Sequence, residues 1–384
     1  MSVAIPTQRR RNAGCDTWPR VRLGEVCEVV YGERIRKIDA TATTYPVYGG
    51  GGETFRWATF NRENACVVSR FAMSKECVRY VKGRFFLNDS GLTVASISKF
   101  LSQEFIDWFL LGSQTKIYAC GQGVAQRNLE IKRFRNLSVP LPPLAIQRRI
   151  AAKLDRLCDI VAKRKNQLSQ LNQLVKSRFV EMFGDPITNP KGWPMAKIGG
   201  HLQFLTSGSR GWAKYYADDG ELFITIKNVK GGKISTNDVQ HVKPPTGAET
   251  ERTRVQEGDL LISITADLGR TGIVTRDLAD QGAYINQHLS CVRLDRKSVE
   301  PLFVAFYLES AAGKAQFEKK NQSAVKAGLN FEAIRSLRFY LPPLALQREF
   351  ASFVEKVDKL AFAARRRRDV ARQLYRAKIQ EFFG

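Results

Sequence analysis

Guanidinium and amide side chains placed between short apolar segments are the groups in this sequence best suited to specific chemistry. Arg can donate two hydrogen bonds to the O6 and N7 edge of guanine, Asn or Gln can pair similarly with adenine, and Lys attracts phosphate. The candidates for contacts with a nucleic acid in the first half of the chain are Tyr48, Arg56, Arg70, Lys75, Arg79, Gln122, Gln126 and Arg127. Candidates in the second half are Ser207, Arg210, Lys214, Tyr215, Lys227, Asn228, Lys230, Arg270, Asn286, Gln287 and Lys326. The alternative interpretation of each candidate is that it is an ordinary surface residue in contact with solvent only.

The sequence lacks the usual catalytic and metal-binding patterns. Its seven cysteines include no C-x-x-C pair and its three histidines no H-x-x-x-H spacing, so we expect no bound metal. There is no G-x-x-x-x-G-K-[ST] loop for a nucleoside triphosphate and no N-P-P-Y-type segment for methylating a flipped base. The glycines at 49–52 open no recognisable helix, which disfavours a phosphate-binding loop. We therefore expect no catalytic residue.

The charge of the chain indicates an anionic partner. Lys and Arg number 61 against 37 Asp and Glu, a formal net charge of +24. Nucleic acid and an anionic membrane surface both fit this charge. However, no apolar run approaches the roughly 20 residues of a membrane span, and no apolar stretch follows the basic N-terminal cluster as in a signal peptide. We expect a cytoplasmic protein that binds nucleic acid and no membrane.

The chain is internally repeated. The segment LPPLAIQR at 141–148 returns as LPPLALQR at 341–348, within an ungapped match of 122–184 to 322–384. A weaker match relates the segments that begin at Trp18 and Trp193, whereas the stretches in between differ strongly. Since 384 residues suit two domains of roughly 150 residues, the repeat predicts two equivalent domains, which we call the heads, that bind different targets.

Each repeat ends in a heptad pattern. Apolar residues recur at alternating steps of four and three, which predicts a long helix with a coiled-coil seam. The first seam is Ile150, Leu154, Leu157, Val161, Leu168, Leu171 and Val175. The second is Phe350, Val354, Val357, Ala361, Ala364, Ala371 and Tyr375. Because each helix has one seam, we expect the two to pack together, antiparallel since a whole head separates them.

Charged residues interrupt these seams. Arg164 and Arg368 occupy seam positions, where they either fix the register of the pair or extend to its edge. The basic run at 365–368 is either a phosphate contact or a solvated face. A simple dimerising coiled coil is an alternative to the intramolecular pair, but it leaves the duplicated heads unexplained.

The heads are predicted to be α+β. Short apolar segments between turn residues, such as CVVSRF, YVKGRFFL, DLLISIT and LSCVRL, predict strands. Helical stretches are expected near 102–111 and 301–317. The predicted fold is therefore two mixed α/β domains separated by two long helices packed as an antiparallel coiled coil.

These features together resemble the DNA-specificity subunits of type I restriction-modification enzymes. The resemblance rests on the paired W-P openings at Trp18 and Trp193, the entries VPLPPLAIQRRI and FYLPPLALQREF, the helix ending EMFGDP and the Gly-Asp-Leu-Leu segment. It covers about 18–384, and its strongest element is the doubled L-P-P-L-A-x-Q before a long helix. The second helix departs from the first in ending at Gly384 without the Asp-Pro that follows Gly184.

The resemblance implies that each head is a target-recognition domain that reads half of a bipartite site in double-stranded DNA. The expected division is a basic, disordered tail at 1–15, target-recognition domains at 16–140 and 187–340, and conserved helical spacers at 141–186 and 341–384. Methyltransferase subunits would dock on the helices and bring S-adenosylmethionine. Restriction subunits would bring ATP and Mg, so this chain would bind no cofactor and perform no catalysis.

Two other function classes stay open at this point. A stand-alone sequence-specific DNA-binding regulator would also be basic, duplicated and coiled, but it would purify without a methyltransferase. Catalysis within a head is disfavoured by the missing motifs, and it would show as methylation or cleavage by the purified chain.

Overall fold

The structure, a computed structural model, describes residues 18–37, 44–320 and 328–384. By their internal contacts, the residues form two compact units. The first unit extends to Asn166 and also includes Ala364–Gly384, and the second is Gln167–Ala363. The tail predicted at 1–15 lies outside the described residues.

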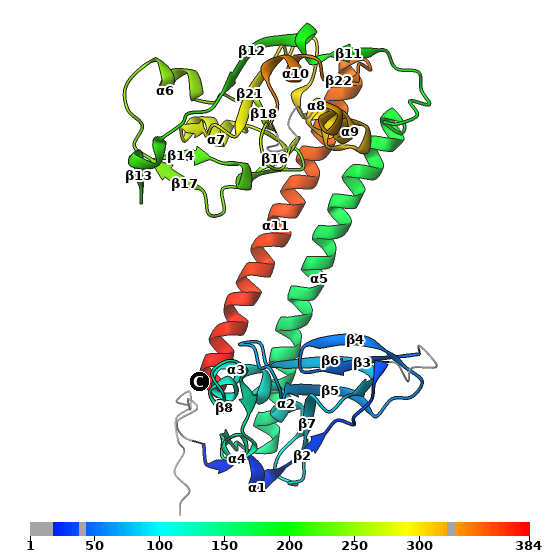
Figure 1. Ribbon diagram of the computed structural model, residues 1–384, viewed down its shortest axis with the longest axis vertical. Coiled ribbons are helices and arrows are strands. Elements are labelled where there is room, and N and C mark those ends of the chain that lie inside the picture. The colour runs from blue at the N-terminus through cyan, green and yellow to red at the C-terminus, as the bar shows by residue number, and fades with distance from the viewer. Residues whose placement is uncertain (1–17, 38–43, 321–327) are drawn as a thin grey trace, which may run out of the picture. The chain divides into compact units, whose positions relative to one another are not determined.

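The first head is built on a six-stranded sheet with the order β2-β7-β5-β6-β3-β4 (Figure 1). Strands β3 and β6 run parallel, and the other neighbours run antiparallel. The strands are β1 (Arg20–Arg22), β2 (Cys27–Tyr31), β3 (Tyr45–Gly49), β4 (Gly52–Trp57), β5 (Arg62–Ser69), β6 (Val78–Leu87), β7 (Gly91–Ser96), β8 (Gly121–Gln122), β9 (Asn128–Leu129) and β10 (Ser138–Pro140). The helices are α1 (Leu23–Val26), α2 (Gln103–Gly112), α3 (Gln114–Ala119) and α4 (Ile131–Arg135).

Helix α2 closes the core of this head. Ser102 begins it, because its side chain accepts a hydrogen bond from the backbone N–H of Phe105. Phe105 and Phe109 are fully buried, and they belong to the same core as Val68 of β5 and Leu92 of β7. The apolar segments of strands and helix therefore bury one another.

The second head distributes the same strand order over two sheets. One sheet has the order β12-β21-β18-β19 and the other β13-β17-β14-β20. The strands are β11 (Met195–Lys197), β12 (Leu202–Ser207), β13 (Tyr216–Ala217), β14 (Glu221–Ile224), β15 (Val229–Lys230), β16 (Lys233–Ile234), β17 (Gln240–Val242), β18 (Leu260–Ser263), β19 (Thr271–Ile273), β20 (Ala283–Ile285), β21 (Leu289–Leu294) and β22 (Arg338–Tyr340). The helices are α6 (Ala248–Thr253), α7 (Arg276–Asp280), α8 (Pro301–Glu309), α9 (Ala311–Lys320) and α10 (Phe331–Arg335).

The correspondence between the heads follows from the pairings. Strands β12, β21 and β18 match β2, β7 and β5, and β19 and β20 together match the single long strand β6. The parallel pair β14 and β20 matches β3 and β6. Helix α7 and its flanking turns lie between β19 and β20, so they divide what is one strand in the first head.

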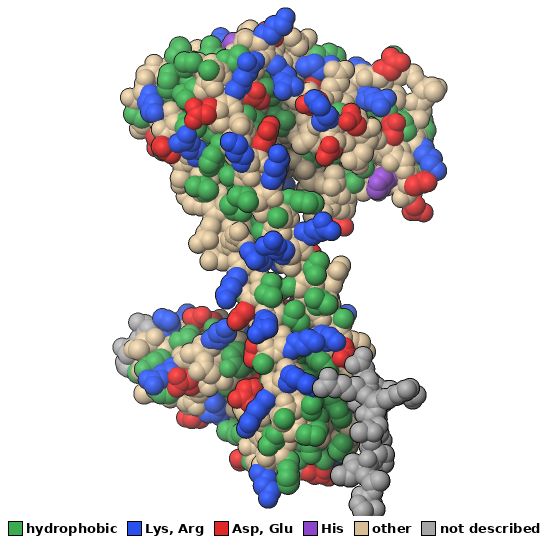
Figure 2. Space-filling model, turned by 180° about the vertical axis from the view of Figure 1, so that it is seen from behind, with side chains coloured by type: hydrophobic (Ala, Val, Ile, Leu, Met, Phe, Trp, Pro, Cys, Tyr) green, Lys and Arg blue, Asp and Glu red, His purple; other side chains and the backbone are tan. Residues whose placement is uncertain are grey.

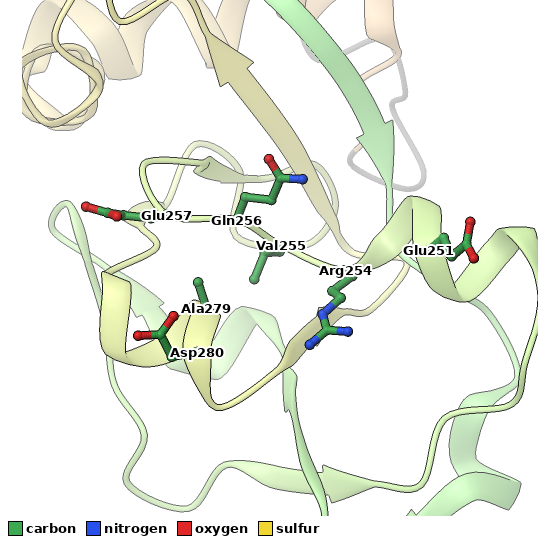
Figure 3. A pocket seen from close by; sticks show the side chains of 7 residues that line it. All are labelled: Glu251, Arg254, Val255, Gln256, Glu257, Ala279 and Asp280. Carbon is green, nitrogen blue, oxygen red and sulfur yellow. The ribbon is translucent and has the colours of Figure 1, made fainter.

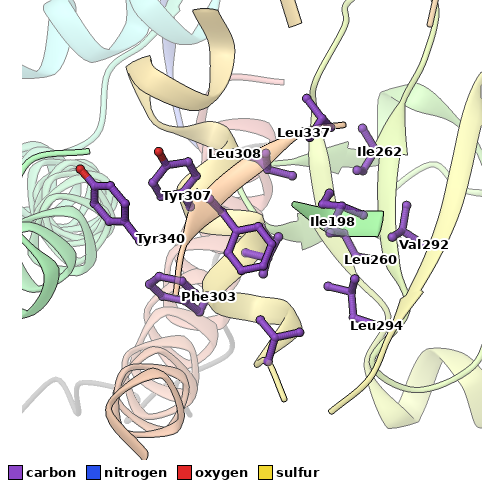
Figure 4. Close-up of a cluster of buried hydrophobic side chains, with 14 of the residues drawn as sticks. Ile198, Leu260, Ile262, Val292, Leu294, Phe303, Tyr307, Leu308, Leu337 and Tyr340 are labelled. Atoms are coloured by element: carbon purple, nitrogen blue, oxygen red, sulfur yellow. The ribbon is translucent and has the colours of Figure 1, made fainter. Parts of the chain in front are cut away.

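The core of the second head lies between the β12-β21-β18-β19 sheet and helix α8. Leu260, Ile262 and Val292 of the sheet are fully buried, as is Phe303 of α8 (Figure 4). Tyr307 of α8 stacks edge-on against Tyr340 at a centroid distance of 4.9 Å. Tyr340 in turn donates a hydrogen bond to the carbonyl of Asp185, which ties the end of the head to the connector after the first long helix.

The two long helices are α5 (Leu144–Phe183) and α11 (Leu344–Phe383), each of 40 residues. They pack antiparallel in both units. In the second unit, Phe179 late in α5 meets Phe350 early in α11 at 5.3 Å between ring centroids. In the first unit, Leu154 early in α5 shares a core with Phe383 at the end of α11. The predicted fold class, two mixed α/β domains with an antiparallel helix pair, is confirmed.

Candidate nucleic-acid interface

Four distant segments of the first head meet at the end of strand β6. Asn88 follows this strand, and its side-chain Oδ1 accepts hydrogen bonds from the N–H and Oγ of Ser90 at 3.0 and 2.6 Å. Gly32 passes directly over this turn, because a Cβ there would lie 2.0 Å from the Asn88 carbonyl oxygen. Only glycine fits so close an approach. We call this arrangement, residues 31–33, 70–71, 88–90 and 129, the Asn corner.

Arg70 enters the Asn corner directly after strand β5. Its backbone N–H donates to the Ser90 carbonyl at 2.9 Å. Its guanidinium carbon lies 4.5 Å from the ring centroid of Tyr31 and 4.7 Å from that of Phe71. Its Nη1 donates to the Asp89 carbonyl at 2.7 Å. One predicted contact residue is therefore held in a fixed position.

The glycine-rich turn at 49–52 lies beside this corner. The Gly50 carbonyl accepts hydrogen bonds from Arg79 Nη2 at 2.6 Å and from Ser69 Oγ at 2.7 Å. The Gly50 N–H donates to Ser90 Oγ at 3.1 Å. These bonds use the polar groups of the turn to hold it against the sheet, and Arg79 acts as one of its supports.

The other predicted residues of the first head have different settings. Tyr48 packs edge-on against Phe85 at 5.5 Å between centroids, which makes it part of the core. Gln122 donates to Glu130 at 2.5 Å, and the guanidinium of Arg127 lies 4.7 Å from the Tyr118 ring centroid. The exposed candidates of this head without a contact described above are Arg56, Lys75 and Gln126.

The second head has the same corner, made of residues 207–209, 264–265, 286–288 and 329. A Cβ on Gly208 would lie 2.2 Å from the Asn286 carbonyl oxygen, and Asn286 Oδ1 accepts from the His288 N–H at 3.2 Å. Ile264 takes the place of Arg70, since its N–H donates to the His288 carbonyl at 3.0 Å. The predicted residues Ser207, Asn286 and Gln287 are thus brought together here.

The remaining candidates of the second head are either engaged in contacts within the head or exposed. Asn228 is buried, and its amide donates to the Ser235 carbonyl and accepts from Thr225, so it is occupied in holding its own loop. Tyr215 packs edge-on against Trp212, and Arg270 pairs with Asp267. The exposed candidates are Arg210, Lys214, Lys227 and Lys230. Lys326 lies outside the described residues.

The predicted seam residues face the interior of each unit to different degrees. In the second unit, Phe350, Val354, Val357, Ala361 and Val175 are buried, and Leu168 and Leu171 are half-buried. In the first unit, Ile150, Leu154, Ala364 and Ala371 are buried, and Leu157, Val161 and Tyr375 are half-buried. Burial is therefore deepest where each helix passes a head.

The predicted seam did not include two buried residues near the end of α5 that pack against the second head. Phe179 and Phe183 are buried, with Phe179 at 5.6 Å and Phe183 at 4.6 Å from the Phe303 ring centroid. A strict heptad predicts only one seam residue per turn, and here the helix presents a wider face to a head than a two-helix seam requires.

Two glutamines of the repeated motif fix each helix to its head. Gln147 is fully buried, and it accepts from the Ser102 N–H at 2.8 Å and donates to the carbonyls of Phe100 and Pro142. Gln347 is also fully buried, accepts from the Glu300 N–H at 2.9 Å and donates to the Pro342 carbonyl. Sequence analysis did not single them out, although the repeat contained the signal. They set the direction of each head on its own helix.

A surface cleft of the second head does not suit DNA. Its lining combines the carboxylates of Glu251, Glu257 and Asp280 with one guanidinium, that of Arg254 (Figure 3). Such a surplus of negative charge repels phosphate. By contrast, Lys and Arg side chains are spread widely over the visible face of the molecule in Figure 2.

Three further properties of the described residues bear on chemistry, namely metal binding, thiol reactivity and membrane insertion. Within 18–37, 44–320 and 328–384, no group of three or more His, Cys, Asp or Glu residues is placed to hold a metal ion. Burial raises the pKa of the Cys27 thiol to about 12 and that of Cys77 to about 11, so both stay protonated at neutral pH. None of the helices in the described ranges combines the length and the apolar character needed to cross a membrane.

Comparison with known proteins relates this arrangement to one family. The model of the type I restriction modification DNA specificity domain matches the chain twice, at residues 15–173 and 211–370. The type I restriction enzyme EcoBI specificity subunit of Escherichia coli is 23% identical over 273 residues, which cover 65% of this chain and 57% of that protein. The chain spans about three fifths of the length of the first curated relatives it matches, with shares of 57, 61, 59 and 59%.

Solved structures share the fold. The S subunit of a type I restriction-modification system from M. genitalium has a TM-score of 0.70 and 15% identity, with 99% of both chains covered. A structure from work on complex assembly and conformational transition of the type I R-M system has a TM-score of 0.53 and 20% identity, covering 98% of this chain and 99% of that one.

Proposed function

The chain belongs to the type I restriction modification DNA specificity family, and on that premise we propose that it selects the DNA target of a type I restriction-modification enzyme. Each head reads one half of a bipartite site by contacts with base edges. The general positive charge of the chain adds affinity for the DNA backbone. The helix pair sets the distance between the half-sites.

One observation carries this proposal. Both heads build the same Asn corner, with a glycine crossing over an asparagine turn at Gly32 and Asn88 and again at Gly208 and Asn286. The side chains on the two corners nevertheless differ. A protein that recognises two unlike half-sites needs the same backbone arrangement twice, with different side chains on each copy.

The proposal includes partners that supply the chemistry. DNA methyltransferase subunits dock on the helices and bring S-adenosylmethionine, and restriction subunits bring ATP and Mg. Val370 and Leu374 lie one helical turn apart on α11 and are 50% and 48% exposed, and such neighbouring apolar side chains are suited to a protein partner. This chain contributes no catalytic group and no cofactor site, and the complex acts in the cytoplasm, where the DNA is.

We assign the roles by segment. Residues 16–140 and 187–340 are the target-recognition domains, and residues 141–186 and 341–384 are the helical spacers. The helices begin at Leu144 and Leu344, directly after a Pro-Pro pair in each case. Proline favours the entry to a helix, since its missing N–H is not needed there.

Co-expression tests the proposed function against its rival. The chain is produced together with methyltransferase subunits of the same family, the complex is purified, and the methylated motif in host DNA is mapped with and without the chain. We expect stable co-purification and a bipartite motif that appears only when the chain is present. A chain that purifies alone, binds DNA and directs no methylation would instead be a regulator.

A further inference from the structure

The Asn corner places one backbone position of each head in the same setting. In the first head, Arg70 donates its N–H to the Ser90 carbonyl and accepts at its own carbonyl from the Leu129 N–H at 2.8 Å. In the second head, Ile264 makes the same two bonds, to His288 and from Leu329 at 3.0 Å. Positions 70 and 264 are therefore equivalent, although 194 residues of sequence separate them.

The side chains at this position differ in kind. Ile264 is 8% exposed and belongs to the core of its head. Arg70 is half-buried, and it lies over the Tyr31 and Phe71 rings, which are 43% and 42% exposed. The first head thus presents a guanidinium and two aromatic rings where the second head has an aliphatic residue. No requirement of the shared backbone explains this difference.

The guanidinium of Arg70 has donors to spare. Arg carries five N–H donors in a planar fork, and the bond from Nη1 to the Asp89 carbonyl uses one of them. Among the described residues, no acceptor pairs with its Nε or Nη2. The two rings and the Asp89 carbonyl nevertheless fix the plane of the group, so little conformational entropy is lost when a ligand binds.

The fixed orientation of the guanidinium favours a base edge over a phosphate. The two rings and the Asp89 carbonyl hold the group in one plane, and reading a base requires such a fixed orientation. Arg can also bind a phosphate with its fork, but a phosphate accepts hydrogen bonds from many directions and is bound by Lys as well. A planar fork held in one orientation instead matches the paired O6 and N7 acceptors of guanine.

We propose that Arg70 is a base-reading residue of the first head, and that Tyr31 and Phe71 hold its guanidinium toward a guanine in one half-site. This inference rests on the proposed function of the heads as DNA readers. The corresponding corner of the second head carries other polar groups. Thr265 Oγ1 lies 2.6 Å from His288 Nδ1, with Gln287 beside them. The second head therefore reads a different base with the same frame.

The test compares variants of the full chain in complex with methyltransferase subunits. The variants are Arg70→Ala, Arg70→Lys and, as the matched control, Arg84→Ala. Arg84 is a suitable control because it also lies over an aromatic ring, that of Phe60 at 4.7 Å, and pairs with Glu63 near the opposite end of β5. Methylation rates are measured on duplexes that carry each base at every position of the target.

We expect Arg70→Ala to lose roughly 5- to 150-fold in discrimination at one position of the first half-site, the range measured for one bidentate contact. Arg70→Lys should not restore it, because an ammonium group lacks the planar fork. Reading of the second half-site should stay intact in both, which also shows that the chain is folded. Arg84→Ala should match the unaltered complex.

Two results would overturn the assignment. If Arg70→Ala lowers methylation of all duplexes equally and Arg70→Lys restores it, Arg70 contacts a phosphate. If Arg70→Ala behaves like Arg84→Ala, the residue makes no contact with DNA. In either case an unaltered complex that methylates a bipartite motif leaves the proposed function standing. Failure of the unaltered complex to do so would count against the proposed function itself.

Discussion

The heads and the helices of this protein have diverged to different degrees. In the heads, the strand order and the Asn corner are kept while the side chains at positions 70 and 264 are Arg and Ile. In the helices, even the buried glutamines Gln147 and Gln347 make equivalent bonds. Side chains have thus changed at the corners, whereas the parts that hold the heads on their helices are fixed by burial.

This contrast predicts that the two kinds of region respond differently to change. Alterations in the helices should move or loosen the heads without altering what either head reads. Alterations at a corner should affect one half-site and leave the geometry unchanged. The largest effect is expected from a change in helix length and the smallest from a single buried carboxyl group.

Lengthening one helix should change the distance between half-sites. Seven residues inserted near Ser169 preserve the phase of the seam and add about 10 Å, or roughly three base pairs of rise. We expect methylation at the original spacing to fall roughly 10²-fold, since misplacement of this size disrupts catalysis. The half-site sequences should persist, and a motif map of DNA methylated by the variant complex would show a longer spacer or none.

An insertion in the connector provides the control for helix length. Seven Gly and Ser residues added after Ile187 leave both helices unchanged, so the motif should keep its spacing. If the helix insertion also leaves the spacing and activity unchanged, the helices are docking surfaces and do not set the distance.

The buried glutamines should be equally important in both units. Gln147→Leu leaves the Ser102 N–H without its acceptor, and Gln347→Leu does the same to the Glu300 N–H. Each substitution should lower the free energy of unfolding by about 2–5 kcal/mol, because buried backbone groups lose their partners. Urea denaturation followed by circular dichroism measures this loss.

Gln173→Leu and Gln373→Leu are the matched controls, since these glutamines are also repeated but exposed. They should change stability by about 0.5 kcal/mol or less. A large loss for only one of the buried pair would show that the two junctions are not equivalent.

The smallest expected effect concerns a carboxyl group present in one head alone. Burial raises the pKa of Asp107 in α2 to about 6, although Gln103 donates a hydrogen bond to it. Ser102, which begins α2, corresponds to Glu300, which begins α8. The position in the second head that is equivalent to Asp107 is therefore Ala305.

The raised pKa sets the direction in which stability changes with pH. The contribution of protonated Asp107 to the free energy of unfolding is fully present below about pH 4 and is lost as the pH rises through about 6. Asp107→Asn should therefore stabilise the protein by about 2 kcal/mol at pH 7.5 and have no effect near pH 4. Glu104→Gln, on the exposed side of the same helix, is the control. An equal gain at both pH values would contradict a charge effect.

Sequence analysis predicted the periodic parts of the fold. The seams predicted two long helices, because a heptad repeat over many turns is a dense signal, and α5 and α11 are each 40 residues long. The strands β5, β6, β18 and β21 followed from short apolar segments between turns.

The Asn corner could not be predicted in the same way. It depends on the convergence of Gly32, Arg70, Asn88 and Leu129, which are far apart in the sequence and carry no shared pattern. Arg70 was a candidate on residue type alone, whereas Tyr31 and Phe71 were not candidates, and only the structure shows that they are exposed beside it. Asn228 was also a candidate by type, and only the structure shows its amide occupied by its own loop.

Exchange of a whole head tests the central claim most directly. Residues 193–340 are replaced with the head of another specificity subunit of the same family, and the methylated motif of the resulting complex is mapped. The account predicts that one half of the motif changes to that of the donor, while the other half and the original spacing stay the same. A change in both halves, or in neither, would contradict independent reading by two heads on a common helical frame.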